Sequence, residues 1–307
     1  MAKLLEARGL VKKFSNEKVI NHIDIDVDPG ECIGILGPND AGKTTLLKLL
    51  SSRMQPDAGD LYIHGIDINI EPYKVKKMIG TVPEHENLDW DFSLKDNLLI
   101  FASYFNISKQ EASKRARDLL HRYDLEDMAE VSLDFLDYCK LRKALFCRSL
   151  ITNPDLLIID EPTRGLDAMT KIFIRQELLK LKTEKKSLII ATEDITDIEE
   201  VCDSVAILSK GKIIAQGPPQ DLVKEKVGDE VVELTIESRD IDYYTSKIAK
   251  DYEYKVLNES IRLFLRPGQT PQEVMRTFSS KNILIRRATL EDVFVKVVDK
   301  NFPQVRA

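Results

Sequence analysis

The chain has 307 residues, of which 43% are hydrophobic, 31% charged and 7% aromatic, a composition typical of a globular protein and not of a disordered one. Its formal net charge of −6 argues against sequence-independent binding to nucleic acid, which depends on clustered Lys and Arg, so we expect no nucleic-acid partner. No apolar run approaches the roughly 18 residues that cross a bilayer, and the charged first residues lack the apolar stretch of a secretory signal. We therefore expect a cytoplasmic protein.

Apolar runs typical of β-strands alternate with helical patterns over the first 226 residues. The predicted strands are residues 31–36, 61–63, 78–82, 156–159, 187–191, 204–208 and 213–215. Helices are expected at residues 42–50 and 219–226, and leucines and alanines at three- and four-residue spacing predict a helical insertion from about residue 93 to residue 150. Because strands that alternate with helices usually pair in parallel, we expect a mostly parallel sheet.

A second predicted unit follows a break at residues 227–229 and has the order strand, helix, strand, strand, helix, strand, helix. Its elements are expected at residues 231–236, 241–250, 254–257, 260–265, 271–279, 283–285 and 290–298. The βαββαβ part of this order resembles a ferredoxin-like α+β fold. The chain length fits two domains, although one large α/β domain with an appendage fits it equally well.

A glycine-rich pattern, G-x-x-x-x-G-K-T, spans residues 37–44, directly after a predicted strand and at the start of a predicted helix. Such a loop predicts a nucleotide site, because its backbone N–H groups surround a β-phosphate and the helix N-terminus adds positive potential. Lys43 is expected to reach the β- and γ-phosphates, and the Thr44 hydroxyl to bind Mg²⁺. An ordinary glycine-rich turn is the alternative. The predicted cofactor-binding residues of the loop are Pro38, Asn39, Asp40, Ala41, Gly42, Lys43, Thr44 and Thr45.

Two acidic residues end the strand predicted at residues 156–159 and supply the second half of such a site. Asp160 is expected to hold magnesium, directly or through water, and Glu161 to orient or deprotonate the attacking water. Acidic residues also commonly end buried strands without a catalytic role, which is the alternative for this pair. Together with the phosphate-binding loop, the pair favours ATP and Mg²⁺ as the bound cofactors.

The run EPTRGLD at residues 161–167, together with the phosphate-binding loop, resembles the ATP-binding subunits of ABC transporters, and the resemblance covers residues 4 to about 225. In that family the position of Asp167 belongs to a loop that crosses a dimer interface. The tail motif ATLEDVF at residues 288–294 and the segments 87–89 and 96–98 are similar to the ABC-2 subfamily, which includes drug-resistance and nodulation-factor exporters.

This resemblance implies an α/β fold with an ABC-type P-loop NTPase core at residues 1–226, which includes an antiparallel β-subdomain and a helical insertion at about 84–150. A small α+β, ferredoxin-like accessory domain is implied at residues 229–307. The resemblance also implies a dimer of ATPase subunits, peripheral on the cytoplasmic face of the membrane beneath a membrane-embedded permease. The helical insertion would then carry the permease contact.

The resemblance assigns roles to residues outside the loop as well. Phe14 occupies the position of an aromatic residue that stacks on adenine, and a core Phe is the alternative. Glu84 stands where the family has a glutamine, so it is a candidate for catalysis and for magnesium binding beside Thr44 and Asp160. Glu193 stands where the family has a histidine that touches the γ-phosphate, so it is a further candidate catalytic residue.

Departures from the family pattern add negative charge around the predicted nucleotide. Asp40 replaces a glycine, Glu84 and Glu193 replace neutral or basic residues, and Asp137 lies in LDYCK at residues 136–140, where the family has its LSGGQ signature. Since like charges repel in a partly desolvated site, we expect ATP binding to be preserved and hydrolysis to be weak.

Two alternatives follow from these departures. The chain is either a slow ATPase or a pseudo-ATPase whose nucleotide regulates assembly with a permease or a partner ATPase. Because each nucleotide in the family lies between the phosphate-binding loop of one subunit and the signature of the other, the altered signature favours a heterodimer with a second ATPase subunit. A homodimer is the alternative.

Overall fold

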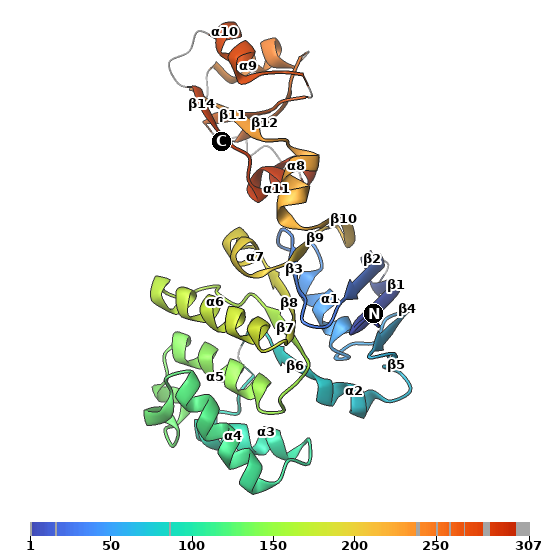
Figure 1. Cartoon of the computed structure of the whole chain (residues 1–307), viewed down its shortest axis with the longest axis vertical. Coiled ribbons are helices and arrows are strands. Elements are labelled where there is room, and N and C mark those ends of the chain that lie inside the picture. The colour runs from blue at the N-terminus through green and yellow to red at the C-terminus, as the bar shows by residue number, and fades with distance from the viewer. Residues whose placement is uncertain are drawn as a thin grey trace. The chain divides into compact units, whose positions relative to one another are not determined.

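The computed structural model describes residues 2–15, 17–85, 87–237, 240–249, 251–257, 259–266, 268–278 and 283–298 (Figure 1). The chain divides into two compact units, Met1–Ile213 and Ile214–Ala307. The boundary expected at residues 226–229 lies later in the chain than this division and stays a prediction. No helix among the described residues is long and apolar enough to span a membrane.

A six-stranded, largely parallel sheet forms the centre of the first unit, with the strand order β10-β9-β3-β8-β7-β6. Its strands are β3 (Cys32–Leu36), β6 (Ile79–Val82), β7 (Leu156–Asp160), β8 (Ser187–Thr192), β9 (Ser204–Ser209) and β10 (Lys212–Gly217). In the parallel register Leu36 lies beside Thr192, and Asp160 lies beside Ala191. The carboxyl ends of β3, β7 and β8 therefore meet at one edge of the sheet.

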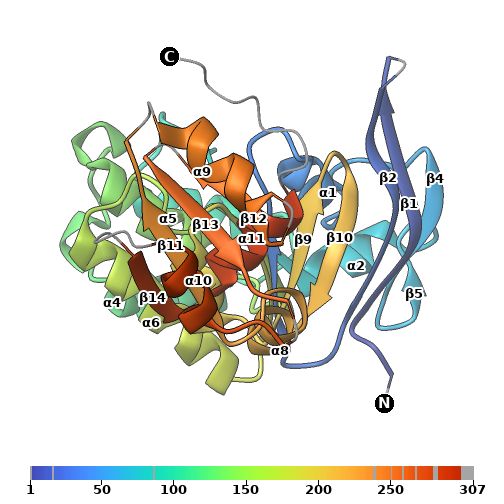
Figure 2. The ribbon, with the colours of Figure 1, turned by 90° about the horizontal axis from the view of Figure 1, so that it is seen from above.

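The two faces of this sheet are covered by different elements, because successive side chains of a strand point to opposite sides. Leu157 and Ile159 pack with the helices that follow β6, whereas Leu156 and Ile158 pack with α1 (Lys43–Leu50) and with a second, antiparallel sheet. Figures 1 and 2 show α1 between the two sheets of this unit.

The antiparallel sheet has the order β2-β1-β4-β5. Its strands are β1 (Leu5–Phe14), β2 (Glu17–Val27), β4 (Ala58–Ile63) and β5 (Ile66–Asp67). The expectation that residues 61–63 belong to the parallel sheet is wrong: they end β4, which pairs with β1 in antiparallel register. No strand was predicted at β2, although its buried Ile23, Ile25 and Val27 alternate with more exposed residues in a strand pattern.

The predicted helical insertion lies between β6 and β7. It consists of α3 (Leu94–Ser103), α4 (Lys109–Arg122), the short 3₁₀ helices Glu126–Met128 and Leu133–Phe135, and α5 (Tyr138–Leu150). The other helices of the unit are α2 (Pro72–Met78), α6 (Ala168–Thr183) and α7 (Ile195–Val201). Met78, predicted to begin a strand, is the last residue of α2.

The elements that follow α8 (Pro219–Lys226) have the order predicted for the second unit. They are β11 (Glu230–Thr235), α9 (Ile241–Ile248), β12 (Glu253–Leu257), β13 (Ser260–Phe264), α10 (Pro271–Thr277), β14 (Ile283–Arg287) and α11 (Leu290–Val298). The strands form one antiparallel sheet in the order β12-β13-β11-β14. The predicted helix ends Lys250 and Ser279 lie outside the described residues.

Asp292, from the ATLEDVF tail motif, fastens α11 to this sheet. It is fully buried, accepts a hydrogen bond from the Thr289 backbone N–H at 2.9 Å, and pairs with Arg286 at 2.7 Å and Arg262 at 2.9 Å. Burial by itself raises the pKa of Asp292, but the hydrogen bonds and ion pairs outweigh it and hold the pKa below its usual value. The motif therefore has a structural role in this unit.

Candidate functional site

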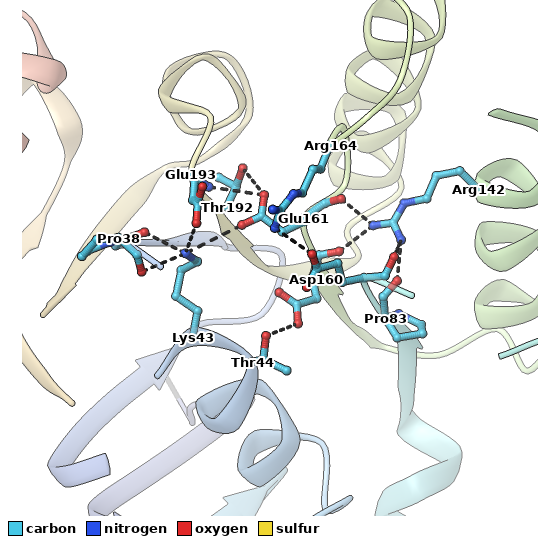
Figure 3. Close-up of polar contacts among 12 residues, drawn as sticks. Pro38, Lys43, Thr44, Pro83, Arg142, Asp160, Glu161, Arg164, Thr192 and Glu193 are labelled. Atoms are coloured by element: carbon cyan, nitrogen blue, oxygen red, sulfur yellow. Dashed lines mark hydrogen bonds and ion pairs between the residues drawn. The ribbon is translucent and has the colours of Figure 1, made fainter. Parts of the chain in front are cut away.

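The glycine-rich loop connects the end of β3 to the start of α1, and its backbone conformation depends on particular residues (Figure 3). Gly42 has a φ of 104°, and a Cβ atom there would lie 2.8 Å from the Val19 carbonyl oxygen, so only glycine fits. Asp40 has a φ of 62°, a conformation that Asp adopts more readily than most residues. The loop therefore forms despite the replacement of a glycine by Asp40.

Lys43 begins α1 and lies at the centre of the site, with an exposed fraction of 7%. Its ammonium donates hydrogen bonds to the carbonyl oxygens of Gly37 at 2.7 Å and Pro38 at 3.2 Å. It also donates to Glu193 Oε1 at 3.2 Å and lies 3.8 Å from Glu161 Oε1 (Figure 3). Three of the residues predicted for the site, Lys43, Glu161 and Glu193, are thus brought together.

Thr44 and Asp160 form the second contact across the site: the Thr44 hydroxyl donates to Asp160 Oδ2 at 2.8 Å. The other carboxylate oxygen, Asp160 Oδ1, is buried and has no hydrogen-bond partner among the described residues. Burial raises the pKa of Asp160, while the bond from Thr44 opposes that rise. A buried carboxylate oxygen beside a hydroxyl is a donor set of the kind that a hard cation such as Mg²⁺ takes, so the residues fit the ion.

Glu161 is the first residue after β7 and is held in a strained conformation. Its φ of 48° places it in the left-handed region, at a cost of about 1 to 2 kcal/mol for a residue other than glycine. The side chain is 5% exposed, and Oε2 accepts bonds of 3.4 Å from the Thr192 hydroxyl and from the Glu193 backbone N–H. Burial raises the pKa of Glu161, and Lys43 opposes that rise.

The positions of Glu84 and Phe14 do not test the roles predicted for these residues. The Glu84 carboxylate accepts a hydrogen bond from Arg164 at 2.7 Å, a pairing that no sequence pattern indicated. Phe14 ends β1 and is 46% exposed, so the alternative that it is a core residue is wrong. Its stacking on adenine and the binding of magnesium by Glu84 stay predictions. Of the remaining loop residues, Asn39 and Asp40 are exposed and Ala41 is buried.

The LDYCK stretch enters α5, and its residues make local contacts. Asp137 is the N-cap of α5 and accepts a hydrogen bond of 2.8 Å from the Lys140 backbone N–H, which lowers the pKa of Asp137. The Tyr138 hydroxyl donates to the Arg164 carbonyl oxygen at 3.2 Å, and the Cys139 thiol donates to Asp167 Oδ2 at 3.0 Å. The stretch is thereby tied to the EPTRGLD run.

Arg142, one turn into α5, is a functional candidate that sequence reasoning missed. It is 1% exposed and donates to backbone carbonyls that follow β6 and that lie at and just after the end of β7 (Figure 3). Its acceptors are the carbonyl oxygens of Pro83, of Glu84 at 3.3 Å, of Asp160 at 2.5 Å, of Glu161 at 2.7 Å and of Pro162 at 3.3 Å. The guanidinium therefore fixes the backbone that carries both acidic residues of the site.

Asp197, in α7, was missed as well. It is fully buried and accepts bonds of 2.7 Å from the Thr163 hydroxyl and from Arg175, and one of 3.3 Å from the Thr192 hydroxyl. Because Thr192 also contacts Glu161, Asp197 supports the wall of the site behind that residue.

A cavity of about 250 Å³ adjoins the Thr44 and Asp160 side of the site. It is lined by Thr44, Leu47, Lys48, Ser51, Arg53, Thr81, Val82, Pro83, Glu84, His85, Asn87, Ile158 and Asp160. A phosphate-binding loop after β3, an acidic pair after β7 and an antiparallel sheet against α1 together define a P-loop nucleotide-binding protein of the ABC cassette type.

Comparison with known proteins agrees with this class. Residues 20–164 match the family model described as ABC transporter. The chain is 31% identical to the Nod factor export ATP-binding protein I of Burkholderia lata over 297 residues, which are 96% of this chain and 97% of that protein. It is 32% identical to the protein of the same name from Cupriavidus metallidurans over 301 residues, which are 98% and 99% of the two chains.

Solved structures agree as well. An ATP-binding subunit of an ABC transporter matches with a TM-score of 0.67 and 26% identity, over 72% of this chain and 92% of that one. A dimeric ATP-binding cassette in a post-hydrolysis state, bound to ADP and Pi, matches with a TM-score of 0.64 and 26% identity, over 70% and 98%. The chain belongs to the ATP-binding subunits of ABC transporters, a family of ATPases. The predicted fold class is confirmed.

Proposed function

We propose that the chain binds Mg-ATP and drives export through a separate membrane permease, as the ATP-binding subunit of an ABC-2-like exporter. The contact between the Thr44 hydroxyl and Asp160, with the second carboxylate oxygen buried and unpartnered, carries the proposal. It brings the end of β7 to the phosphate-binding loop with the donor atoms that a nucleotide-bound magnesium requires. Thr44 and Asp160 would hold the ion, which would supply positive charge against the negative charge that develops on the transferred phosphate.

The chain's own residues divide the remaining work. Lys43 holds the phosphates, and Glu161 orients or deprotonates the attacking water. Burial favours the protonated form of Glu161, and the ammonium of Lys43 favours the ionised form that a base requires. Arg142 keeps both acidic residues in place through the carbonyls of Asp160 and Glu161.

The export role rests on the names of the relatives, and the helical insertion offers a surface for the permease. Trp90 and Phe92, in the loop before α3, are 48% and 41% exposed. The Asn97 side chain holds that loop by accepting from the Asp89 backbone N–H at 2.8 Å and donating to its carbonyl oxygen at 2.9 Å. Exposed aromatic residues on a fixed loop suit a protein interface. We place the chain on the cytoplasmic face of the membrane, beneath that permease.

A second candidate function, a pseudo-ATPase that regulates assembly, is favoured by the LDYCK stretch. The Asp137 carboxylate caps α5, so the Lys140 N–H is already engaged with a negative group. A homodimer would present this end to both nucleotides, so we propose a heterodimer in which the partner supplies an intact signature.

Phosphate release by the isolated chain, with the Glu161→Gln variant as control, tests how far hydrolysis is preserved. Loss of one transition-state donor lowers turnover by roughly 10²- to 10³-fold in other enzymes, so we expect slow release. Turnover comparable with ordinary transporter ATPases and abolished in the variant would refute the weak-activity proposal and leave the ATPase itself intact.

Pairing is tested by purification of the tagged chain from membranes with identification of the co-purifying chains. We expect a permease and a second ATPase subunit. Mixing with that subunit, in the Glu161→Gln background that traps the closed state, should then give ATP-dependent dimers. Stable ATP-driven self-dimers at micromolar concentration, with no gain from any partner, would exclude the heterodimer.

A further inference from the structure

The ammonium of Lys43 already has a full set of hydrogen-bond acceptors. A lysine has three N–H donors, and here they meet the carbonyl oxygens of Gly37 and Pro38 and the carboxylate of Glu193 (Figure 3). A nucleotide that engages Lys43 must therefore displace acceptors, and one of them carries a formal negative charge.

The backbone of Glu193 is held in place from two sides. Its N–H donates to Glu161 Oε2 at 3.4 Å, at the end of β8. The next residue, Asp194, caps α7 and pairs with Lys171 at 3.3 Å and with Arg175 at 3.1 Å, both from α6. The Glu193 side chain is 36% exposed and can turn, but its Cα cannot move away from Lys43 without breaking these contacts.

We propose that Glu193 sets the nucleotide preference of this site: it competes with the γ-phosphate for Lys43 and so shifts selectivity from ATP toward ADP. The inference rests on the proposed nucleotide-binding function and names its specificity-determining residue. A P-loop lysine binds both the β- and the γ-phosphate of ATP, whereas ADP has a β-phosphate and no γ-phosphate.

The charges explain why the two nucleotides should respond differently. The β-phosphate of ADP can accept the two N–H donors of Lys43 that now bond to the carbonyl oxygens of Gly37 and Pro38. The third N–H donor of Lys43 then stays with Glu193. The γ-phosphate needs the donor that Glu193 holds, and the displaced carboxylate then stands beside a phosphate of like charge. Since a charge-assisted hydrogen bond corresponds to about ten- to a hundredfold in affinity, the discrimination should be of that size.

The experiment compares the affinities of the full chain for Mg-ADP and for a non-hydrolysable Mg-ATP analogue. Glu193→Gln keeps the size of the side chain and removes its charge, and Glu193→His supplies a donor instead. We expect both variants to bind the ATP analogue at least tenfold more tightly than the unaltered chain and to bind ADP with less than threefold change. Glu130→Gln is the matched control, because it removes the exposed ion pair with Lys95, of 2.5 Å, in another part of the same unit.

The result that overturns the inference is a shift of less than fivefold in the ratio of the two affinities in Glu193→Gln and Glu193→His. If neither nucleotide binds the unaltered chain or the variants, the proposed function itself fails. Thermal unfolding without nucleotide confirms that each variant is folded before its affinities are compared.

Discussion

The phosphate-binding loop and the LDYCK stretch each lead into a helix, and they leave the two helix N-termini in opposite states. At α1 the N-cap is Gly42, no described side chain caps the helix, and no acidic residue lies in its first turn. At α5 the carboxylate of Asp137 caps the helix, and its oxygen accepts the Lys140 N–H. The N–H groups at the start of the first helix are open to an anion, while the Lys140 N–H of the second is already paired with a carboxylate.

This difference shows that a motif with replaced residues can still form the same local structure while its chemistry changes. An N-cap Asp stabilises α5 as well as a serine does, so nothing in local structure opposes the substitution. What changes is the charge at the helix end: the carboxylate of Asp137 stands there, and under the proposed function it would face the nucleotide of the partner subunit. The next four predictions test how far the two ends are independent.

The largest effect is expected from Arg142→Ala, because Arg142 lies on α5 and binds the backbone that carries Asp160 and Glu161. Its loss leaves several buried carbonyl oxygens without a donor, so the free energy of unfolding should fall by about 3 to 5 kcal/mol. Urea unfolding measures it. Arg117→Ala, at an exposed position of α4, is the control, and a loss below about 1 kcal/mol in Arg142→Ala would show that the two ends are not coupled through this residue.

Lys43→Ala should act at one end only. ATP binding should weaken by at least about 1.5 to 3 kcal/mol, the contribution of each charge-assisted bond to phosphate, because Lys43 is the flexible cation of the loop. Titration with fluorescent ATP measures the change, with Lys95→Ala as the control at an exposed position. Equal affinity in Lys43→Ala and the unaltered chain would mean that the site assignment is wrong.

Much of the loop could be predicted from the sequence because its contacts join near neighbours, as Lys43 does with Gly37 and Pro38. The bounds of α8 and α11 were predicted for a similar reason, since caps and apolar spacing are local. Arg142 could not be predicted, because its acceptors are backbone carbonyls between 18 and 59 positions away, and a carbonyl leaves no mark in the pattern of side chains.

The pairing of Lys43 with Glu193 was beyond the sequence for another physical reason. The family resemblance implied that Glu193 lies beside the γ-phosphate, but no sequence pattern indicated that its carboxylate accepts a hydrogen bond from Lys43. The two residues are 150 positions apart in the chain, and the parallel pairing of β3 and β8 brings them together.

Asp137→Ala should have a smaller effect than the first two changes. Loss of the N-cap hydrogen bond to Lys140 should lower the free energy of unfolding by about 0.5 to 2 kcal/mol, and binding of ATP to the chain's own loop should stay the same. Unfolding in urea and ATP titration are the measurements. Ser108→Ala removes the N-cap of α4 and serves as the matched control. A change in ATP affinity above threefold in Asp137→Ala alone would contradict the independence of the two ends.

The smallest effect concerns Asp160 in the nucleotide-free, EDTA-treated protein. Burial raises the pKa of Asp160 in the folded chain above its ordinary value of 3.8. The protonated side chain therefore makes its full contribution to stability below pH 3.8, and this contribution is lost as the pH rises through the raised pKa. At pH 7 the ionised side chain therefore weakens the fold, and Asp160→Asn, which can still accept from Thr44, should unfold at a higher temperature. The gain should vanish once the pH falls below the ordinary pKa of 3.8. Asp137 should behave oppositely, because its pKa is lowered and its stabilisation is lost on acidification.

Asp118→Asn, at an exposed position of α4, controls for net charge. If Asp160→Asn were no more stable than Asp118→Asn at pH 7, the buried carboxylate of Asp160 would not destabilise the loop end.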